Sequence, residues 1–136
     1  YAHSPDALEK LLISVRRITK ENKQKLICVF GCGGNRDKSK RVLMGRVSIK
    51  HSDQIIVTND NPRFEDPEII AKQILVANKK KIKVILDRTD AIKYAMKHSL
   101  PNDVIVVAGK GHEQYQEVAG KKIKFSDIKT IKELGW

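Results

Sequence analysis

The sequence predicts an α/β domain: a Rossmann-like three-layer fold with a mostly parallel sheet and a C-terminal antiparallel hairpin. Apolar runs of four or five residues, typical of strands buried on both faces, alternate with segments whose apolar residues recur at helical spacing. That alternation indicates a parallel sheet covered by helices on both faces. The last two strand-like segments instead flank a short glycine turn, as in a hairpin. Because no repeat, low-complexity segment or linker interrupts the pattern, residues 1–136 are read as one domain.

The first half of the chain is expected to form three helices and two strands. Ser4, Pro5 and Asp6 provide an N-cap, a proline at the first helical position and an acid in the first turn. This helix should run to about Asn22. The elements expected after it are a strand over 26–30, a helix marked by apolar residues 42–47 and ending near His51, a strand over 54–57, and a helix marked by 69–75.

The second half of the chain continues the alternation and then changes to a hairpin. A strand is expected over 83–86, a helix marked by residues 91–96, and a strand over 104–108. Segments 114–118 and 122–125 can pair across the turn 119–121, and Ser126 with Asp127 begins a last helix.

The composition limits the classes of partner. A net charge of +11 would suit nucleic acid, an anionic membrane or anionic small molecules. The basic residues are dispersed, however, and aromatics make up only 5% of the chain, which leaves few stacking platforms for single-stranded nucleic acid. No apolar run approaches the roughly 18 residues of a membrane span. We therefore expect neither nucleic acid nor a membrane as partner.

The first residue and the two cysteines indicate what kind of protein the chain belongs to and in which redox compartment it works. The chain starts at Tyr1 rather than at Met, so it is expected to be part of a longer protein. Cys28 and Cys32 would lie roughly 13 Å apart in one extended strand, whereas disulfide Cα atoms lie within about 7 Å. Reduced thiols are therefore expected, as in the cytosol. With neither a Cys-x-x-Cys motif nor a cluster of histidines, no metal site is expected.

Three polar loops follow predicted strands, at residues 31–38, 60–63 and 109–113. In a parallel sheet the carboxyl ends of the strands meet at one edge, where ligands bind. Pro62 fixes the shape of the middle loop. The first loop is glycine-rich but is neither a Walker A loop nor a dinucleotide fingerprint, because Arg36 stands where the third glycine is needed. Each loop alone could be a solvated turn; together they indicate a binding site.

The side chains of these loops suit a zwitterion. Arg36 and Arg63 are planar forks for a carboxylate or phosphate. Asp60, Asn61 and Glu113 are acceptors for an ammonium group. A nucleic-acid backbone would need cations only, so the mixture favours an amino acid.

The chain resembles the C-terminal domain of the Mur ligases, MurE type. Four motifs in the family's order and spacing carry the resemblance, and they span nearly the whole chain. They are Tyr1-Ala2-His3-Ser4-Pro5, Gly31-Cys32-Gly33-Gly34-Asn35-Arg36-Asp37-Lys38, Asp60-Asn61-Pro62-Arg63 and Gly109-Lys110-Gly111-His112-Glu113.

The resemblance implies an ATP-dependent acid–amino-acid ligase of bacterial peptidoglycan synthesis, cytoplasmic and monomeric. In that family ATP phosphorylates a carboxylate of UDP-N-acetylmuramoyl-L-alanyl-D-glutamate, and the amino group of meso-diaminopimelate attacks the acyl phosphate. The family's ATP and Mg²⁺ are held mainly by a central P-loop domain that this chain lacks. The chain is therefore expected to hold no catalytic residue, to bind the incoming amino acid and to close over ATP, and to be inactive alone.

The resemblance also implies roles for individual residues. Arg36 and Arg63 would grip the distal carboxylate of diaminopimelate. The rest of that substrate site would comprise Asp60, Asn61, Pro62, Gly109 and Glu113, and the residues on the ATP side would be Tyr1, His3, Lys38 and Lys40. Asn35 stands where the family commonly has Asp, which keeps the hydrogen bonds but removes one charge.

Two other interpretations stay open from the sequence. One is a basic Rossmann-like module that binds nucleotide or nucleic acid without catalysis; such binding would weaken steeply with salt. The other is a domain like the C-terminal domain of folylpolyglutamate synthetase, although that family lacks the Asp-Asn-Pro-Arg turn. The sequence also leaves open whether the substrate is diaminopimelate or an analogue such as lanthionine, which differs at one central atom.

Overall fold

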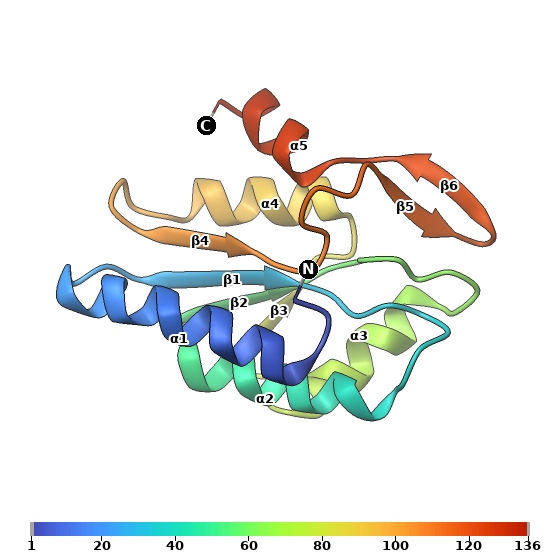
Figure 1. Cartoon of the computed structure of the whole chain (residues 1–136), viewed down its shortest axis with the longest axis horizontal. Coiled ribbons are helices and arrows are strands. Elements are labelled where there is room, and N and C mark those ends of the chain that lie inside the picture. Colours follow the sequence, from blue (N-terminus) through green and yellow to red (C-terminus); the bar gives the residue numbers. More distant parts are fainter. Residues whose placement is uncertain (1, 136) are drawn as a thin grey trace.

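A computed structural model describes residues 2–135 and shows a parallel sheet between two layers of helices (Figure 1). The four strands have the order β3-β2-β1-β4, and all three pairings are parallel. The predicted fold class is confirmed. The strands are β1 (Leu26–Phe30), β2 (Gln54–Val57), β3 (Ile82–Val84) and β4 (Val104–Val107).

The helices cover both faces of the sheet (Figure 1). Three helices lie on one face: α1 (Pro5–Glu21), α2 (Ser39–His51) and α3 (Pro67–Leu75). The other face is covered by α4 (Arg88–Lys97), and α5 (Asp127–Glu133) packs against α4 on that side.

Alternate residues of β1 belong to two hydrophobic cores, one on each face of the sheet, because successive side chains of a strand point to opposite faces. Cys28 and Phe30 of β1 pack in the core that includes Leu8 of α1, whereas Ile27 and Val29 pack in the core of α4. All five residues of β1 are buried, which explains why the strand is a continuous apolar run.

Side-chain caps set the helix starts. The Ser4 hydroxyl accepts a hydrogen bond from the Ala7 amide at 3.1 Å, as the sequence predicts. Asp87 likewise accepts from the amide of Asp90, so α4 begins at Arg88 and β3 ends before it. The sequence placed this strand at 83–86 and marked the helix only from 91. The two boundaries shift because the cap at Asp87 was not recognised.

The hairpin consists of β5 (Tyr115–Val118) and β6 (Lys121–Lys124), which form a separate two-stranded sheet. Val118 pairs with Lys121, so its turn has two residues rather than the three expected. Ala119 (φ 49°) and Gly120 (φ 78°) both have positive φ, the geometry that matches the twist of a hairpin.

Both cysteines are free and buried. Burial raises the pKa of each thiol to about 12, so neither is a reactive thiolate near neutral pH. None of the helices within residues 2–135 has the length and apolar character needed to cross a membrane.

Candidate functional site

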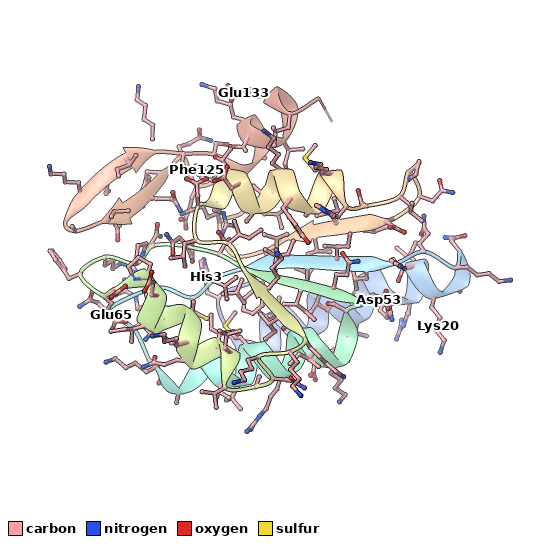
Figure 2. The ribbon with its side chains drawn as sticks, turned by 180° about the vertical axis from the view of Figure 1, so that it is seen from behind. His3, Lys20, Asp53, Glu65, Phe125 and Glu133 are labelled. Atoms are coloured by element: carbon pink, nitrogen blue, oxygen red, sulfur yellow. The ribbon has the colours of Figure 1, made fainter. Side chains whose placement is uncertain are left out.

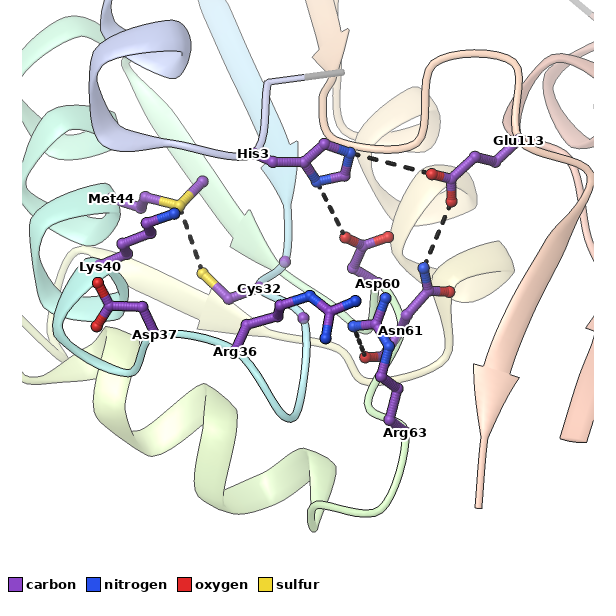
Figure 3. A pocket seen from close by; sticks show the side chains of 12 residues that line it. His3, Cys32, Arg36, Asp37, Lys40, Met44, Asp60, Asn61, Arg63 and Glu113 are labelled. Carbon is purple, nitrogen blue, oxygen red and sulfur yellow. Dashed lines mark hydrogen bonds and ion pairs between the residues drawn. The ribbon is translucent and has the colours of Figure 1, made fainter. Parts of the chain in front are cut away.

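A cavity of about 370 Å³ opens at the carboxyl edge of the parallel sheet (Figure 3). All three predicted loops reach it, together with the segment before α1 and the first turns of α2. Its lining comprises His3, Gly31, Cys32, Gly33, Arg36, Asp37, Lys40, Met44, Asp60, Asn61, Arg63 and Glu113.

Most of the predicted site residues line this cavity, and three described ones do not. Pro62 turns its carbonyl toward Gly34. Gly109 lies behind Asp60. The Lys38 side chain is 65% exposed, with its Nζ 4.0 Å from a carboxylate oxygen of Glu65. The remaining predicted residue, Tyr1, lies outside the described residues.

The glycine-rich loop is pressed against the turn at 60–63. A Cβ at Gly31 would lie 2.0 Å from the Thr58 carbonyl oxygen, and one at Gly34 would lie 1.8 Å from that of Pro62. The Gly34 amide donates to the Asn61 carbonyl at 2.8 Å. The glycines are thus required for close backbone packing of two loops.

Hydrogen bonds fix both the backbone of Arg63 and part of its guanidinium group. Arg63 is a non-glycine residue with φ 52°, fixed by hydrogen bonds from its amide to the Glu117 carbonyl and from the Ala119 amide to its own carbonyl. Its Nε donates to Glu117 at 2.6 Å and its Nη1 to the Gly34 carbonyl at 3.0 Å. Within residues 2–135 its Nη2 donates no hydrogen bond. One edge of the guanidinium therefore stays available to a ligand in the cavity.

Arg36 reaches the same cavity from the glycine-rich loop. A Cβ at Gly33 would lie 2.8 Å from Nη1 of Arg63 and 3.6 Å from Cγ of Arg36, so this glycine separates the two arginines. Arg36 is exposed and donates to the Asn35 carbonyl. The Asn35 side-chain oxygen accepts from the Phe64 amide at 3.1 Å. The amide at position 35 thus supplies the acceptor that an aspartate would, without the charge.

The acidic side of the cavity faces His3. Nδ1 of His3 lies 3.7 Å from Oδ2 of Asp60, and Nε2 lies 4.0 Å from Oε2 of Glu113 (Figure 3). The resemblance assigned His3 to the ATP side, a role that stays a prediction. Its position between two carboxylates marks where a cation fits in the cavity.

Lys110 is the site residue that the sequence analysis missed. Its side chain is fully buried, and its Nζ contacts Asn61 Oδ1 and the Tyr115 carbonyl, each at 2.9 Å. It also lies 3.3 Å from Asp60 Oδ1 and 3.4 Å from Glu113 Oε1. A lysine in a polar loop is normally exposed. The available signal was its position between Gly109 and Gly111, which both have positive φ.

This contact corrects the expected role of Asn61. Its Oδ1 accepts from Lys110 and from the Glu117 amide, so the amide presents its donor, Nδ2, to Glu113 at 3.4 Å. The sequence analysis treated Asn61 as an acceptor for the ligand's ammonium, but its oxygen is already used within the fold.

Two buried arginines, also missed, support the loops. Arg41 donates to the Gly33 carbonyl, to Gln73 and to Glu65. Burial alone would raise the pKa of Glu65, but the hydrogen bonds from Arg41 and the Asn35 amide, together with the charges of Arg41 and Lys38, outweigh it, and the pKa lies below its usual value. Arg88 binds both carboxylate oxygens of Asp127 and the carbonyls of Asn59 and Ala108.

The described residues offer no place for a metal ion. Across 2–135, His, Cys, Asp and Glu side chains do not gather in groups of three that could ligate one.

The family model described as Mur ligase, glutamate ligase domain, matches residues 1–111. The chain belongs to the Mur ligase family. The resemblance stated from the four motifs is thereby confirmed, and a ligase is favoured over a nucleic-acid-binding module.

The curated relatives are much longer than this chain. A UDP-N-acetylmuramoyl-L-alanyl-D-glutamate–2,6-diaminopimelate ligase of Neisseria meningitidis serogroup A is 50% identical over 131 residues, which cover 96% of this chain and 26% of that protein. The enzyme of the same name from Aquifex aeolicus is 50% identical over 136 residues, covering 98% and 28%. The chain thus spans about a quarter of the length of these relatives.

A solved structure shows the same fold. The structure of a UDP-N-acetylmuramoyl-L-alanyl-D-glutamate–2,6-diaminopimelate ligase superposes with a TM-score of 0.86 at 38% identity. The match covers 98% of this chain and 28% of that one. The fold described above is therefore that of one domain of a Mur ligase.

Proposed function

We propose that this chain is the C-terminal, amino-acid-binding domain of a longer ATP-dependent ligase. The whole enzyme adds meso-diaminopimelate to UDP-N-acetylmuramoyl-L-alanyl-D-glutamate in bacterial peptidoglycan synthesis. The names of the relatives that share half of its residues support this substrate pair.

The cavity carries the proposal, because it has two chemically different sides. Arg36 and Arg63 lie on one, and the carboxylates of Asp60 and Glu113 lie on the other. The distal end of meso-diaminopimelate carries one carboxylate and one ammonium. The carboxylate pairs with the arginine forks, and the ammonium with the carboxylates. A volume of about 370 Å³ lies in the range of small-molecule sites.

Discrimination follows from the unused edge of Arg63. A lysine side chain has the distal ammonium but lacks the distal carboxylate, so it leaves the Nη2 edge of the guanidinium desolvated and unpaired. A site built to pair a charged group rejects an analogue without it, because the lost partner costs more than the contact itself contributes.

The chemical step belongs to the rest of the enzyme. ATP converts the carboxylate of the nucleotide substrate to an acyl phosphate, which the amino group of the bound diaminopimelate attacks. This chain orients that amino group and closes over ATP, with Tyr1, His3, Lys38 and Lys40 on the nucleotide side. Lys40 lines the cavity, and a cation there would suit an approaching acyl phosphate. The free cysteines suit the reducing cytoplasm.

A substrate panel on the full-length enzyme tests the proposal. ADP release would be measured with diaminopimelate, lanthionine, lysine and ornithine as acceptors. We expect turnover with diaminopimelate and lanthionine, since the clamp contacts only the shared distal end. The kcat/KM of lysine and ornithine should be lower by about 100-fold, or about 2.7 kcal/mol. Equal use of lysine and diaminopimelate would contradict the assignment.

A further inference from the structure

We infer that Lys110 is a positioning residue for one wall of the cavity, formed by Asp60, Asn61 and Glu113, which we call the ammonium-binding wall. From the interior side of this wall, Lys110 fixes the orientation of its side chains and its net charge. It does not line the cavity, yet it contacts three residues that do: Asp60, Asn61 and Glu113. The inference rests on the proposed function of this cavity.

The backbone around Lys110 directs its side chain inward. Gly109 (φ 111°) and Gly111 (φ 58°) adopt conformations that other residues rarely reach. The turn they form carries the lysine from the end of β4 into the interior, where its side chain is fully buried. A lysine there must find acceptors for its three N–H groups. Three oxygens accept hydrogen bonds from it, on Asn61, Glu113 and Tyr115, and Asp60 Oδ1 lies 3.3 Å away as an ion-pair partner.

The first consequence is the direction of the Asn61 amide. Lys110 and the Glu117 amide both donate to Asn61 Oδ1. Two donors on one atom require that atom to be the oxygen, so Nδ2 must face Glu113. Without Lys110, one of the two donors that hold the amide in this orientation is lost.

The second consequence is that the two oxygens of each carboxylate face different ways, one toward the interior and one toward the cavity. Asp60 directs Oδ1 to Lys110 and Oδ2 toward His3. Glu113 does the same with Oε1 and Oε2. The inward oxygens lie 3.3 and 3.4 Å from Nζ of the lysine, and the outward oxygens lie 3.7 and 4.0 Å from the two ring nitrogens of His3 (Figure 3). That outward pair is the place for the ammonium of the substrate.

The third consequence concerns charge. Two carboxylates against one buried ammonium leave the wall with one net negative charge, which one substrate ammonium neutralises. Without Lys110, two like charges would share a buried site, and one of them would tend to take up a proton. A protonated carboxyl donates a hydrogen bond where the ammonium needs an acceptor. Lys110 thus keeps both outward oxygens available as acceptors.

The test is Lys110→Met in the full-length enzyme, with Lys121→Met as the matched control. Lys121 is exposed on β6. We expect Lys110→Met to raise the KM for diaminopimelate at least tenfold, while the KM values for ATP and the nucleotide substrate change less than threefold. Loss of folded enzyme alone would lower kcat and leave every KM unchanged. Lys121→Met should match the wild type.

Lys110→Gln provides a second variant, because it keeps a donor and most of the length but removes the charge. The same selective rise in KM is expected, with a smaller magnitude. A KM for diaminopimelate within twofold of the wild type in either folded variant would overturn the inference, as would failure of both variants to fold. If the wild-type enzyme itself does not use diaminopimelate, the proposed function fails first, and the two failures are thereby distinguished.

Discussion

Arg63 and Arg88 stand at the same edge of the sheet, and only one of them is open to a ligand. Arg63 follows β2 and Arg88 follows β3. The Arg88 side chain is 0% exposed, and its Nε, Nη1 and Nη2 all donate within the fold. The Arg63 side chain is 19% exposed and lines the cavity with one edge of its fork. The number of donors that the fold has already used separates a structural arginine from a binding one.

The position of Arg63 also depends on Arg88. Arg88 binds the carbonyls of Asn59 and Ala108, which directly precede the loops at 60–63 and 109–113. Its pair with Asp127 joins those loops to α5. The buried arginine therefore positions the loops on which Arg63 and Lys110 stand.

The largest effect is expected for Arg88→Met. The change leaves Asp127 as a buried charge without its partner and removes two loop anchors, so the free energy of unfolding should fall by about 3–5 kcal/mol. Urea denaturation of the 136-residue chain measures this. Arg17→Met, at an exposed position of α1, should change it by less than about 0.5 kcal/mol. If Arg88→Met lowered the free energy of unfolding by less than about 1 kcal/mol, Arg88 would not have the structural role that distinguishes it from Arg63.

Arg63→Ala should affect binding more than folding, and it should lower the free energy of unfolding less than Arg88→Met does, because Arg63 is partly exposed. In the full-length enzyme the KM for diaminopimelate is expected to rise about 30- to 100-fold, because a charged hydrogen-bonded pair of about 2–3 kcal/mol is lost. Arg17→Ala serves again as the control. A KM within twofold of the wild type would refute the assignment of Arg63 to the distal carboxylate.

The smallest effect is expected for Arg16→Met, at a surface pair remote from the cavity. Arg16 binds Asp53 with both side chains about one-third exposed, and Asp53 lies at the opposite end of the sheet from Glu65 of the site (Figure 2). Such pairs contribute about 0.2–1 kcal/mol. The hydrogen bond from Arg16 lowers the pKa of Asp53. The stabilisation is therefore present above the unfolded value of about 3.9 and is lost as the pH falls through the lower folded pKa.

Urea titrations of both chains at pH 7 and below pH 3 measure this difference. The gap between wild type and Arg16→Met should close in acid and narrow at high salt. A gap that persists unchanged below pH 3 would mean that packing of the arginine stem, rather than its charge, stabilises the fold.

Local patterns in the sequence were enough to predict the fold and the meeting of the three polar loops at one cavity. Ser4 caps α1 because a short hydroxyl side chain can reach the free amides of the next turn. Residues 26–30 form a buried strand because all five side chains are apolar. The three polar loops meet at one edge because the strands before them are parallel. Each of these inferences needs only neighbouring residues or the order of elements.

The sequence by itself determined which loops form the cavity, and only the tertiary structure decided which of their charges face it. Lys110 binds a residue 49 positions away, and Arg88 binds one 39 positions away. Whether a cation serves the fold or a ligand depends on such distant partners, because a buried charge is tolerated only where the folded chain supplies its counter-groups. The contact with Lys110 also changes the role of Asn61. The sequence predicted that its side-chain oxygen accepts from the substrate, whereas in the folded chain that oxygen accepts from Lys110.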